Sequence, residues 1–242
     1  MTGAGSGIGF AAVQRLLAEG AQVAATDVNE AGLAKLPGAL AGNLLTLKHD
    51  VTSEAEWRRA VRSAADRFGG LHVLVNCAGI LAHGTIEDTT LADWRRMIDI
   101  NVYGTFLGCR LVMPVIERSG GGAIVIISSG SGMVATAELA SYCASKGAVR
   151  SLSKAIALDG ARRNPPIRCN SIHPGVIETP MVANYFAERD DPAAMEQTWH
   201  RFQPRRQFGK PEDVAAMIAF LASDEAGFVT GAEYVIDDAA TA

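Results

Sequence analysis

Short apolar runs alternate with longer amphipathic stretches along the chain. The apolar runs end at polar or glycine turns and are too short for buried helices, so they predict strands. The stretches between them carry apolar positions at helical spacing. We expect strands at residues 21–27, 44–50, 71–79, 122–129, 167–175 and 233–237. We expect helices at residues 8–19, 53–69, 90–117, 141–159 and 209–223.

This order of elements predicts an α/β fold. Strands that are apolar throughout are typical of a parallel sheet covered by helices on both faces. The pattern indicates a Rossmann-type, doubly wound parallel sheet in three layers, and such sheets bind ligands beyond the carboxyl ends of their strands. Residues 1–242 are expected to form one domain, since no linker or repeat interrupts them.

The composition narrows the range of partners. The formal net charge of −4 leaves no basic surface of the kind that binds nucleic acid. The four cysteines and five histidines show no metal-ligand spacing, so we predict no metal and reduced thiols. No apolar run reaches the length of a membrane span, and the sequence shows no signal peptide. We therefore expect a cytoplasmic protein that does not bind membranes.

A glycine-rich loop stands directly before the first predicted helix. Its glycines permit a tight turn and a close backbone approach, and the helix presents free N–H groups to an anion. This arrangement predicts a site for the pyrophosphate of a dinucleotide. The residues assigned to it are Gly3, Gly5, Ser6, Gly7, Ile8 and Gly9.

Asp27 ends the strand that follows this helix. A carboxylate at that place accepts hydrogen bonds from the ribose hydroxyls and repels a 2′-phosphate. We therefore expect NAD(H) rather than NADP(H) as the cofactor. The alternative is an acid in a surface turn.

Tyr142 and Lys146 are four residues apart and share one face of a predicted helix. Ser129 ends a buried strand, which places it at the ligand-binding edge of the sheet. A free tyrosine has a pKa of about 10, and a nearby ammonium favours its ionised form. The three side chains together predict an acid/base site.

These motifs resemble those of the compact, single-domain short-chain dehydrogenases/reductases. The resemblance extends over nearly the whole sequence, and the motifs follow that family's order. They are TGAGSGIG at residues 2–9, Asp27, Asp50-Val51, NCAG at residues 76–79, Asn101, Ser129, Tyr142 with Lys146, and Pro174-Gly175 followed by Thr179. The resemblance implies an oxidoreductase that transfers a hydride between NAD(H) and a secondary alcohol or ketone.

The resemblance also implies a role for each matching residue. Tyr142 would be the general acid/base, and Ser129 would bind the reacting oxygen. Lys146 would lower the pKa of Tyr142 and bind the nicotinamide ribose, and Asn101 would hold a water that relays protons from Lys146. Further cofactor contacts would be Asp50 and Val51 at the adenine, Asn76, Ala78 and Gly79 beneath the cofactor, and Pro174, Gly175, Val176 and Thr179 towards the carboxamide.

Some of these residues have a simpler interpretation. Asn101 could bond only to backbone, Asp50 could be a helix-start acid, and Thr179 could be a helix N-cap. His173 is the type of residue that often transfers protons near neutral pH. Because it stands between Ile172 and Pro174 at a strand end, we interpret it as a packed or backbone-bonded residue and give it no part in the mechanism.

Residues 180–208 would fold over the substrate as a lid, according to the resemblance. The segment is rich in aromatic residues and methionine, namely Met181, Tyr185, Phe186, Met195, Trp199, Phe202 and Phe208. We expect a bulky, apolar or cyclic secondary alcohol, steroid-like or alicyclic. Several of these side chains could instead pack the lid onto the body or contact a subunit. The alternative reaction is reduction of a 3-oxoacyl thioester, which usually uses NADPH and fits poorly with Asp27.

Three features depart from the family pattern. The cofactor turn reads NCAG, where a second asparagine is common. The tail reads VIDDAATA, where the family usually has an aspartate followed by two glycines. The largest departure is the absence of a strand before the glycine loop. In a sheet of this order that strand lies in the middle, and its loss costs free energy on the scale of the whole folding margin of roughly 5 to 15 kcal/mol.

This gap leads to three expectations. The first is that the biological chain has further apolar, strand-forming residues before Met1. The second, less favoured, is that rearrangement or another polypeptide fills the gap. The third is a function of another class, a catalytically inactive dinucleotide-binding or scaffolding protein. An empty groove beside the strand ending at Asp27 is expected in either of the first two cases.

The resemblance finally implies an assembly. The predicted helices at residues 90–117 and 141–159 correspond to those that pair between subunits in the family. We therefore expect a homotetramer, with a homodimer as the alternative.

Overall fold

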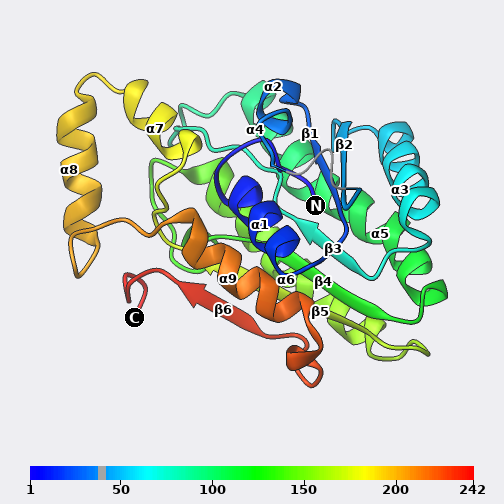
Figure 1. The fold of residues 1–242 in the computed structure, drawn as a ribbon. Helices are drawn as coiled ribbons and strands as arrows, with labels where there is room; N and C mark the ends of the chain where they lie inside the picture. Colours follow the sequence, from blue (N-terminus) through cyan, green and yellow to red (C-terminus); the bar gives the residue numbers. More distant parts are fainter. Residues whose placement is uncertain (38–41) are drawn as a thin grey trace.

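The computed structural model describes residues 1–37 and 42–242. The strands in this part of the chain pair in parallel and form two sheets, one of β1 and β2 and one in the order β3-β4-β5-β6 (Figure 1). They are β1 (Val23–Asp27), β2 (Leu44–Lys48), β3 (Val73–Asn76), β4 (Gly122–Ile127), β5 (Ile167–Pro174) and β6 (Glu233–Ile236).

Helices cover both faces of the four-stranded sheet (Figure 1). They are α1 (Gly7–Ala18), α2 (Glu30–Leu33), α3 (Glu54–Phe68), α4 (Leu91–Ile98), α5 (Gly104–Arg118), α6 (Ala140–Gly160), α7 (Pro180–Ala187), α8 (Pro192–Phe202) and α9 (Pro211–Ala222). Helices α1 and α9 pack together on one face, while α5 and α6 lie on the other with α3 against α5. The predicted three-layered α/β architecture is confirmed.

The alternation of side chains along β4 shows why this strand is apolar throughout. Ile124 and Ile126 belong to the core on the α5 and α6 side, whereas Val125 and Ile127 belong to the core on the α1 and α9 side. All four side chains are buried. Since successive residues of a strand point to opposite faces, a strand between two helical layers has no polar face.

Local signals place the helix ends. Pro211 is the first residue of α9, as expected of proline in a first turn. The Ser53 hydroxyl accepts a hydrogen bond from the N–H of Glu56 and thereby caps α3. The Glu56 carboxylate does not form a capping box with Ser53, because it accepts from the N–H of Asp50 at 2.8 Å instead.

The long helix predicted at residues 90–117 is continuous but not uniform. Helix α4 passes into a π-helical turn at Asp99–Tyr103, and α5 follows directly. A π-helical turn holds one extra residue per turn and often occurs at functional sites. Here it contains Asn101.

The first two residues lie between β1 and β3 and connect the two sheets. The Met1 carbonyl accepts from the N–H of Thr26 at 2.9 Å, and the N–H of Thr2 donates to the Val75 carbonyl at 3.1 Å. Beyond Met1 a groove of about 460 Å³ separates the two strands. It is lined by Leu16, Val23 and Ala24 on one side and by Leu71, Val73 and Val75 on the other. A groove therefore lies beside the strand ending at Asp27.

The parallel strands bring several loops to one edge. The carboxyl ends of β1, β3, β4 and β5 all point to the edge that carries the glycine loop, because the strands share one direction. Helix α8 extends away from the body (Figure 1). No helix within residues 1–37 and 42–242 combines the length and apolar character needed to cross a membrane.

Candidate active site

The glycine loop forms the tight turn that the sequence predicted. Gly3 and Gly7 have φ values of +67° and +52°, which L side chains rarely adopt. A Cβ on Gly9 would lie 2.0 Å from the Gly3 carbonyl oxygen, so only glycine allows this crossing. Helix α1 begins at Gly7, and its first N–H groups face the same edge of the sheet. The loop therefore suits a pyrophosphate at the helix N-terminus.

The Asp27 carboxylate lies against this loop. Its Oδ2 accepts from the N–H of Gly5 at 2.8 Å, and its Oδ1 accepts from the N–H of Asn29 at 2.8 Å. Both bonds hold the carboxylate at the end of β1, beside the glycine loop. Asp27 is thus a positioned acid with two backbone donors, and not an unrestrained surface side chain.

The predicted adenine-side residues follow β2. The Asp50 Oδ1 accepts from the N–H and the hydroxyl of Thr52, so this acid forms a turn before α3. Val51 is buried, and its carbonyl accepts from the indole N–H of Trp57 at 2.9 Å. A Cβ on Gly104 would lie 2.8 Å from the Val51 side chain, which requires glycine at the start of α5.

The turn after β3 is fastened to the glycine loop. The Thr2 hydroxyl accepts from the N–H groups of both Cys77 and Ala78 at 3.1 Å. A Cβ on Gly3 would lie only 2.7 Å from the Ala78 nitrogen. The Asn76 side chain instead points into the core, where its amide contacts the Cys109 sulfur at 3.3 Å. Sequence analysis did not single out Thr2.

Three predicted catalytic side chains come together at this edge. Ser129 follows β4, and Tyr142 and Lys146 lie one turn apart on α6. The Lys146 Nζ lies 5.6 Å from the centre of the Tyr142 ring, and the Ser129 hydroxyl interacts with the phenol. Lys146 is almost fully buried and donates to the Ile127 carbonyl at 2.9 Å.

The expected effect of Lys146 on Tyr142 is not found in this structure. Burial raises the pKa of Tyr142 to about 12, and the Ser129 hydroxyl is the group that opposes this rise. Burial also lowers the pKa of Lys146 to about 8. Desolvation disfavours both charged forms and is the largest influence on both pKa values.

Asn101 joins the catalytic helix to the turn after β3. Its Oδ1 accepts from the N–H of Ile80 at 2.8 Å, and its Nδ2 donates to the Ile80 carbonyl and to the Ser145 hydroxyl, both at 3.0 Å. A Cβ on Gly79 would lie 3.2 Å from this Oδ1 and 3.6 Å from the Lys146 Nζ. Asn101 therefore bonds to more than backbone, and it lies beside Gly79 and Lys146.

The segment after β5 closes the site from the other side. The Thr179 methyl group lies against Gly7, because a Cβ there would be 2.9 Å from it. Thr179 also caps α7, accepting from the N–H of Val182 at 3.4 Å. A Cβ on Gly175 would lie 2.8 Å from that of Asp237, so Pro174-Gly175 passes close to the tail.

The predicted lid, residues 180–208, carries an apolar cluster that reaches the Tyr142 phenol. Tyr185, Phe186 and Phe208 are buried together, and Tyr142 packs against them. Val176, Met195 and Trp199 complete this group, which we name the lid cluster together with Leu81, Leu139, Cys143 and Val182. Phe202 does not join it, since 72% of its surface is exposed. The Tyr185 hydroxyl lies 3.4 Å from the His83 Nδ1, a neighbour that sequence analysis did not identify.

No group of three or more metal-ligating side chains occurs among residues 1–37 and 42–242. The four cysteines, all in this part of the chain, are free thiols. The arrangement instead offers a phenol, an ammonium and a hydroxyl next to a dinucleotide cradle. That combination can exchange a proton with the oxygen of an alcohol or carbonyl.

Known proteins resemble this chain over nearly its whole length. A family model described as enoyl-(acyl carrier protein) reductase matches residues 3–240. A 2,5-dichloro-2,5-cyclohexadiene-1,4-diol dehydrogenase of Sphingobium indicum is 40% identical over 240 residues, which cover 98% of this chain and 93% of the relative. A 3-alpha-(or 20-beta)-hydroxysteroid dehydrogenase of Mycobacterium tuberculosis is 39% identical over 237 residues, covering 98% and 86%.

Two further relatives extend the comparison. An NADP-dependent (R)-specific alcohol dehydrogenase of Lentilactobacillus kefiri is 37% identical over 247 residues, covering 100% of this chain and 95% of the relative. The crystal structure of levodione reductase superposes with a TM-score of 0.93 at 32% identity, covering 100% and 96%. The chain belongs to the short-chain dehydrogenase/reductase family.

Proposed function

We propose that the protein is an NAD-dependent dehydrogenase that interconverts a bulky, apolar or cyclic secondary alcohol and its ketone. One observation carries this proposal, namely the convergence of Ser129, Tyr142 and Lys146 beneath the lid cluster. The Sphingobium and Mycobacterium relatives, whose names specify a cyclic diol and a steroid, support an alicyclic or steroid-like substrate.

The reaction assigns a separate task to each side chain. The nicotinamide, when bound, accepts a hydride from the alcohol carbon or returns one to the ketone. Tyr142 takes the hydroxyl proton during oxidation and gives a proton to the carbonyl oxygen during reduction. Ser129 donates a hydrogen bond to the same oxygen and stabilises its negative charge.

Lys146 and Asn101 serve the cofactor and the proton path in this proposal. The Lys146 ammonium binds the nicotinamide ribose. Asn101 holds a water between Lys146 and solvent. Its side-chain amide bonds to Ile80 in the turn after β3 and to Ser145 on α6. These bonds support the placement of Asn101 where the two segments meet.

The fixed carboxylate of Asp27 supports NAD over NADP. Two backbone N–H groups hold it beside the glycine loop, where the adenosine ribose of a dinucleotide would lie. A negative charge at that place repels a 2′-phosphate. One relative is NADP-dependent by name, so the preference of this chain requires its own measurement.

The other residues proposed to contact the cofactor lie at the same edge of the sheet as the glycine loop. Gly3, Ser6, Gly7, Ile8 and Gly9 would hold the pyrophosphate. The adenine would lie by Asp50 and Val51. Asn76, Ala78 and Gly79 would lie beneath the cofactor, and Pro174, Gly175, Val176 and Thr179 would lie towards the carboxamide. Thr179 contacts Gly7, which supports a site where the segment after β5 lies against the glycine loop.

A homotetramer remains our proposal for the assembly. Large apolar side chains are exposed on the helices expected to pair, including Leu91 and Trp94 on α4, Phe106 on α5 and Leu158 on α6. Exposed apolar patches of this kind mark contact surfaces between proteins. Light scattering of the purified protein distinguishes a tetramer from a dimer. The cytoplasmic location stays a prediction.

The reduction of a 3-oxoacyl thioester is not favoured, because the named relatives include a cyclic diol, a hydroxysteroid and an alcohol dehydrogenase. A catalytically inactive scaffold is the alternative from another class. Titration with NADH, followed by its fluorescence, measures cofactor binding. A panel of steroid, cyclic, aliphatic and sugar alcohols with NAD then measures turnover. We expect binding and the fastest turnover with a cyclic or steroid alcohol, whereas binding without any turnover would favour the scaffold.

A further inference from the structure

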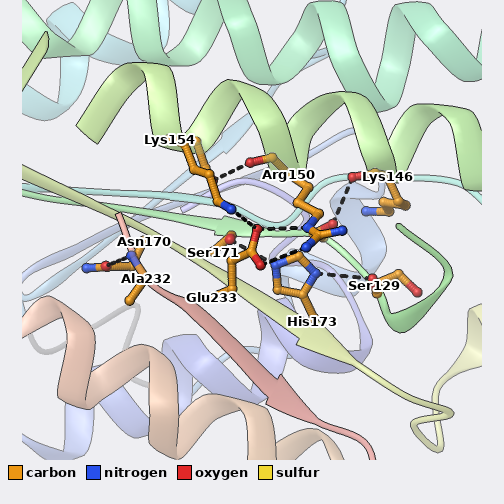
Figure 2. A network of polar contacts seen from close by, with 11 residues as sticks. Ser129, Lys146, Arg150, Lys154, Asn170, Ser171, His173, Ala232 and Glu233 are labelled. Atoms are coloured by element: carbon orange, nitrogen blue, oxygen red, sulfur yellow. Dashed lines mark hydrogen bonds and ion pairs between the residues drawn. The ribbon is translucent and has the colours of Figure 1, made fainter. Parts of the chain in front are cut away.

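His173 lies at the end of β5, fully buried behind the catalytic serine (Figure 2). Its Nδ1 is 3.2 Å from the Ser129 carbonyl oxygen, and its Nε2 is 2.9 Å from the Ser171 hydroxyl. The His173 ring therefore connects the backbone of Ser129 to Ser171 on β5. Sequence analysis interpreted His173 as packed or backbone-bonded, and the contact with the Ser129 carbonyl confirms this.

The two contacts determine the proton on the ring. A carbonyl oxygen can only accept, so Nδ1 must carry the hydrogen that is donated to Ser129. Nε2 then presents its lone pair, and the Ser171 hydroxyl donates to it. Burial lowers the pKa of His173 and favours this neutral form.

Ser129 needs such a contact because it lies beyond the sheet. The last ladder bond of this strand pair runs from the N–H of Ser128 to the Ile172 carbonyl at 2.8 Å. After it the chain leaves the sheet and enters a short 3₁₀ turn at Gly130–Gly132. The His173 ring continues the link between the two strands by one residue, through a side chain instead of backbone.

The Ser129 carbonyl has a second donor, the N–H of Gly132 at 3.0 Å. That bond belongs to the turn itself and moves with it, whereas His173 ties the turn to the sheet. The Ser129 hydroxyl accepts from the N–H of Ser131 at 3.1 Å, so its direction depends on how the whole turn is oriented. A rotation of the Ser129 peptide would therefore turn the hydroxyl away from Tyr142.

We propose that His173 is a positioning residue, whose Nδ1–H fixes the Ser129 peptide so that the serine hydroxyl faces the reacting oxygen. This rests on the proposed dehydrogenase function. It adds a residue that touches neither substrate nor cofactor and acts through Ser129.

Neighbouring charges argue against a role of His173 as a proton relay. Glu233 pairs in register with Ser171 and is the nearby acid, but both its oxygens bind Arg150, at 2.8 and 2.9 Å, and one also binds Lys154 at 2.9 Å (Figure 2). Arg150 and Lys154 follow Lys146 on α6 at intervals of one turn. The carboxylate thus holds α6 to β6 and offers no free acceptor to the imidazole.

The contacts of Glu233 and His173 together explain how side chains from separate elements keep fixed relative positions. Glu233 holds the helix that carries Tyr142 and Lys146, and His173 holds the turn that carries Ser129. His173 lies on β5, and Glu233 lies on the neighbouring strand β6, in register with Ser171. Catalysis is sensitive to small displacements of such groups.

Two variants separate positioning from packing. His173→Leu fills the space but removes the donor, whereas His173→Asn retains an amide N–H near the place of Nδ1. We expect His173→Leu to lower kcat for alcohol oxidation about tenfold, with the Kd for NADH unchanged, and His173→Asn to recover most of the loss. His72→Leu is the control, since His72 is an exposed histidine next to the opposite end of the sheet.

A double-mutant cycle gives the decisive readout. In a Ser129→Ala background, His173→Leu should change kcat less than about twofold, because the group that it positions is gone. An equal loss in both backgrounds would show a purely structural role and overturn the proposal. So would a His173→Leu enzyme with wild-type kcat.

Crystal structures give a readout that does not depend on turnover. The Ser129 hydroxyl should be displaced in His173→Leu and should keep its position in His173→Asn. An undisplaced Ser129 in His173→Leu would overturn the inference. Absence of turnover in the wild-type enzyme with every alcohol would contradict the proposed function instead, and the two failures are thereby distinguished. Thermal denaturation of each variant identifies any that fails to fold.

Discussion

The Oδ2 of Asp27 accepts a hydrogen bond from the backbone N–H of Gly5 at 2.8 Å. The acid at the end of β1 is therefore attached to the loop that is expected to hold the pyrophosphate. Under the proposed function, this contact would couple the choice of cofactor to the binding of phosphate. A substitution that removes the side chain would disturb both, so a test of cofactor choice must keep the acceptor atom.

Asp27→Asn is the substitution that meets this requirement. The amide keeps an oxygen acceptor for Gly5 or Asn29 and removes the negative charge. We expect the ratio of kcat/KM for NAD to that for NADP to fall at least about tenfold, because repulsion of the 2′-phosphate is lost. Steady-state kinetics with both cofactors measure the ratio.

Glu30→Gln is the matched control, since Glu30 is a mostly exposed acid near the same loop that pairs with Lys48. Its cofactor ratio should equal that of the wild type. A wild-type ratio in Asp27→Asn as well would remove Asp27 from cofactor selection.

The ion pairs of Glu233 lead to a prediction about how the stability of the fold depends on pH. Hydrogen bonds from Arg150 lower the pKa of Glu233 from 4.5 to about 2. A carboxyl group whose folded-state pKa is lowered stabilises the fold above its unfolded pKa, and this contribution is lost as the pH falls towards the folded value. We expect Glu233→Gln to cost about 1 to 2 kcal/mol of unfolding free energy near pH 6.

The difference between the wild type and Glu233→Gln should shrink steadily as the pH falls from 4.5 towards 2. Urea denaturation at several pH values measures it. Glu188→Gln provides the comparison, because Glu188 is an exposed acid 3.7 Å from Arg189 and should contribute little at any pH. A difference that does not depend on pH would show that the carboxylate charge is not what stabilises this contact.

The backbone conformation of the C-terminal tail predicts a stabilising substitution. Asp238 and Ala239 have φ values of +58° and +62°, a region that favours glycine. The family usually has two glycines in this segment. The backbone at Asp238 and Ala239 therefore adopts a conformation that suits glycine, although neither residue is a glycine. Ala239→Gly should therefore raise the unfolding free energy by about 0.5 to 1 kcal/mol, since the strain removed exceeds the added entropy of the unfolded chain.

Ala240→Gly is the adjacent control, because Ala240 is not among the residues with positive φ. It should be neutral or slightly destabilising. Equal effects of the two substitutions, measured by thermal or urea denaturation, would contradict the strain at Ala239.

The sequence predicted the elements that periodicity alone determines. Apolar runs that end at turns identified the strands, and the spacing of Tyr142 and Lys146 identified one helix face. The position of Ser129 at a strand end was sufficient to place it with them, because parallel strands end at one edge.

Other features depend on contacts between distant residues, and periodicity carries no signal for them. Thr2 fastens the turn at Cys77 and Ala78. The π-helical turn that directs Asn101 towards Ser145 lies inside a pattern that reads as one regular helix. The raised pKa of Tyr142 was missed because it comes mainly from burial, which the spacing of two residues does not give.

The central claim is that the Tyr142 phenol transfers the proton while NAD(H) carries the hydride. Tyr142→Phe removes one oxygen and keeps the ring in the lid cluster, and Tyr234→Phe on β6 is the control. We predict that kcat for the best cyclic alcohol falls about a thousandfold in Tyr142→Phe, while the Kd for NADH stays within about twofold of the wild type. Tyr234→Phe should keep both values. A Tyr142→Phe enzyme that retained near-normal kcat would contradict the account.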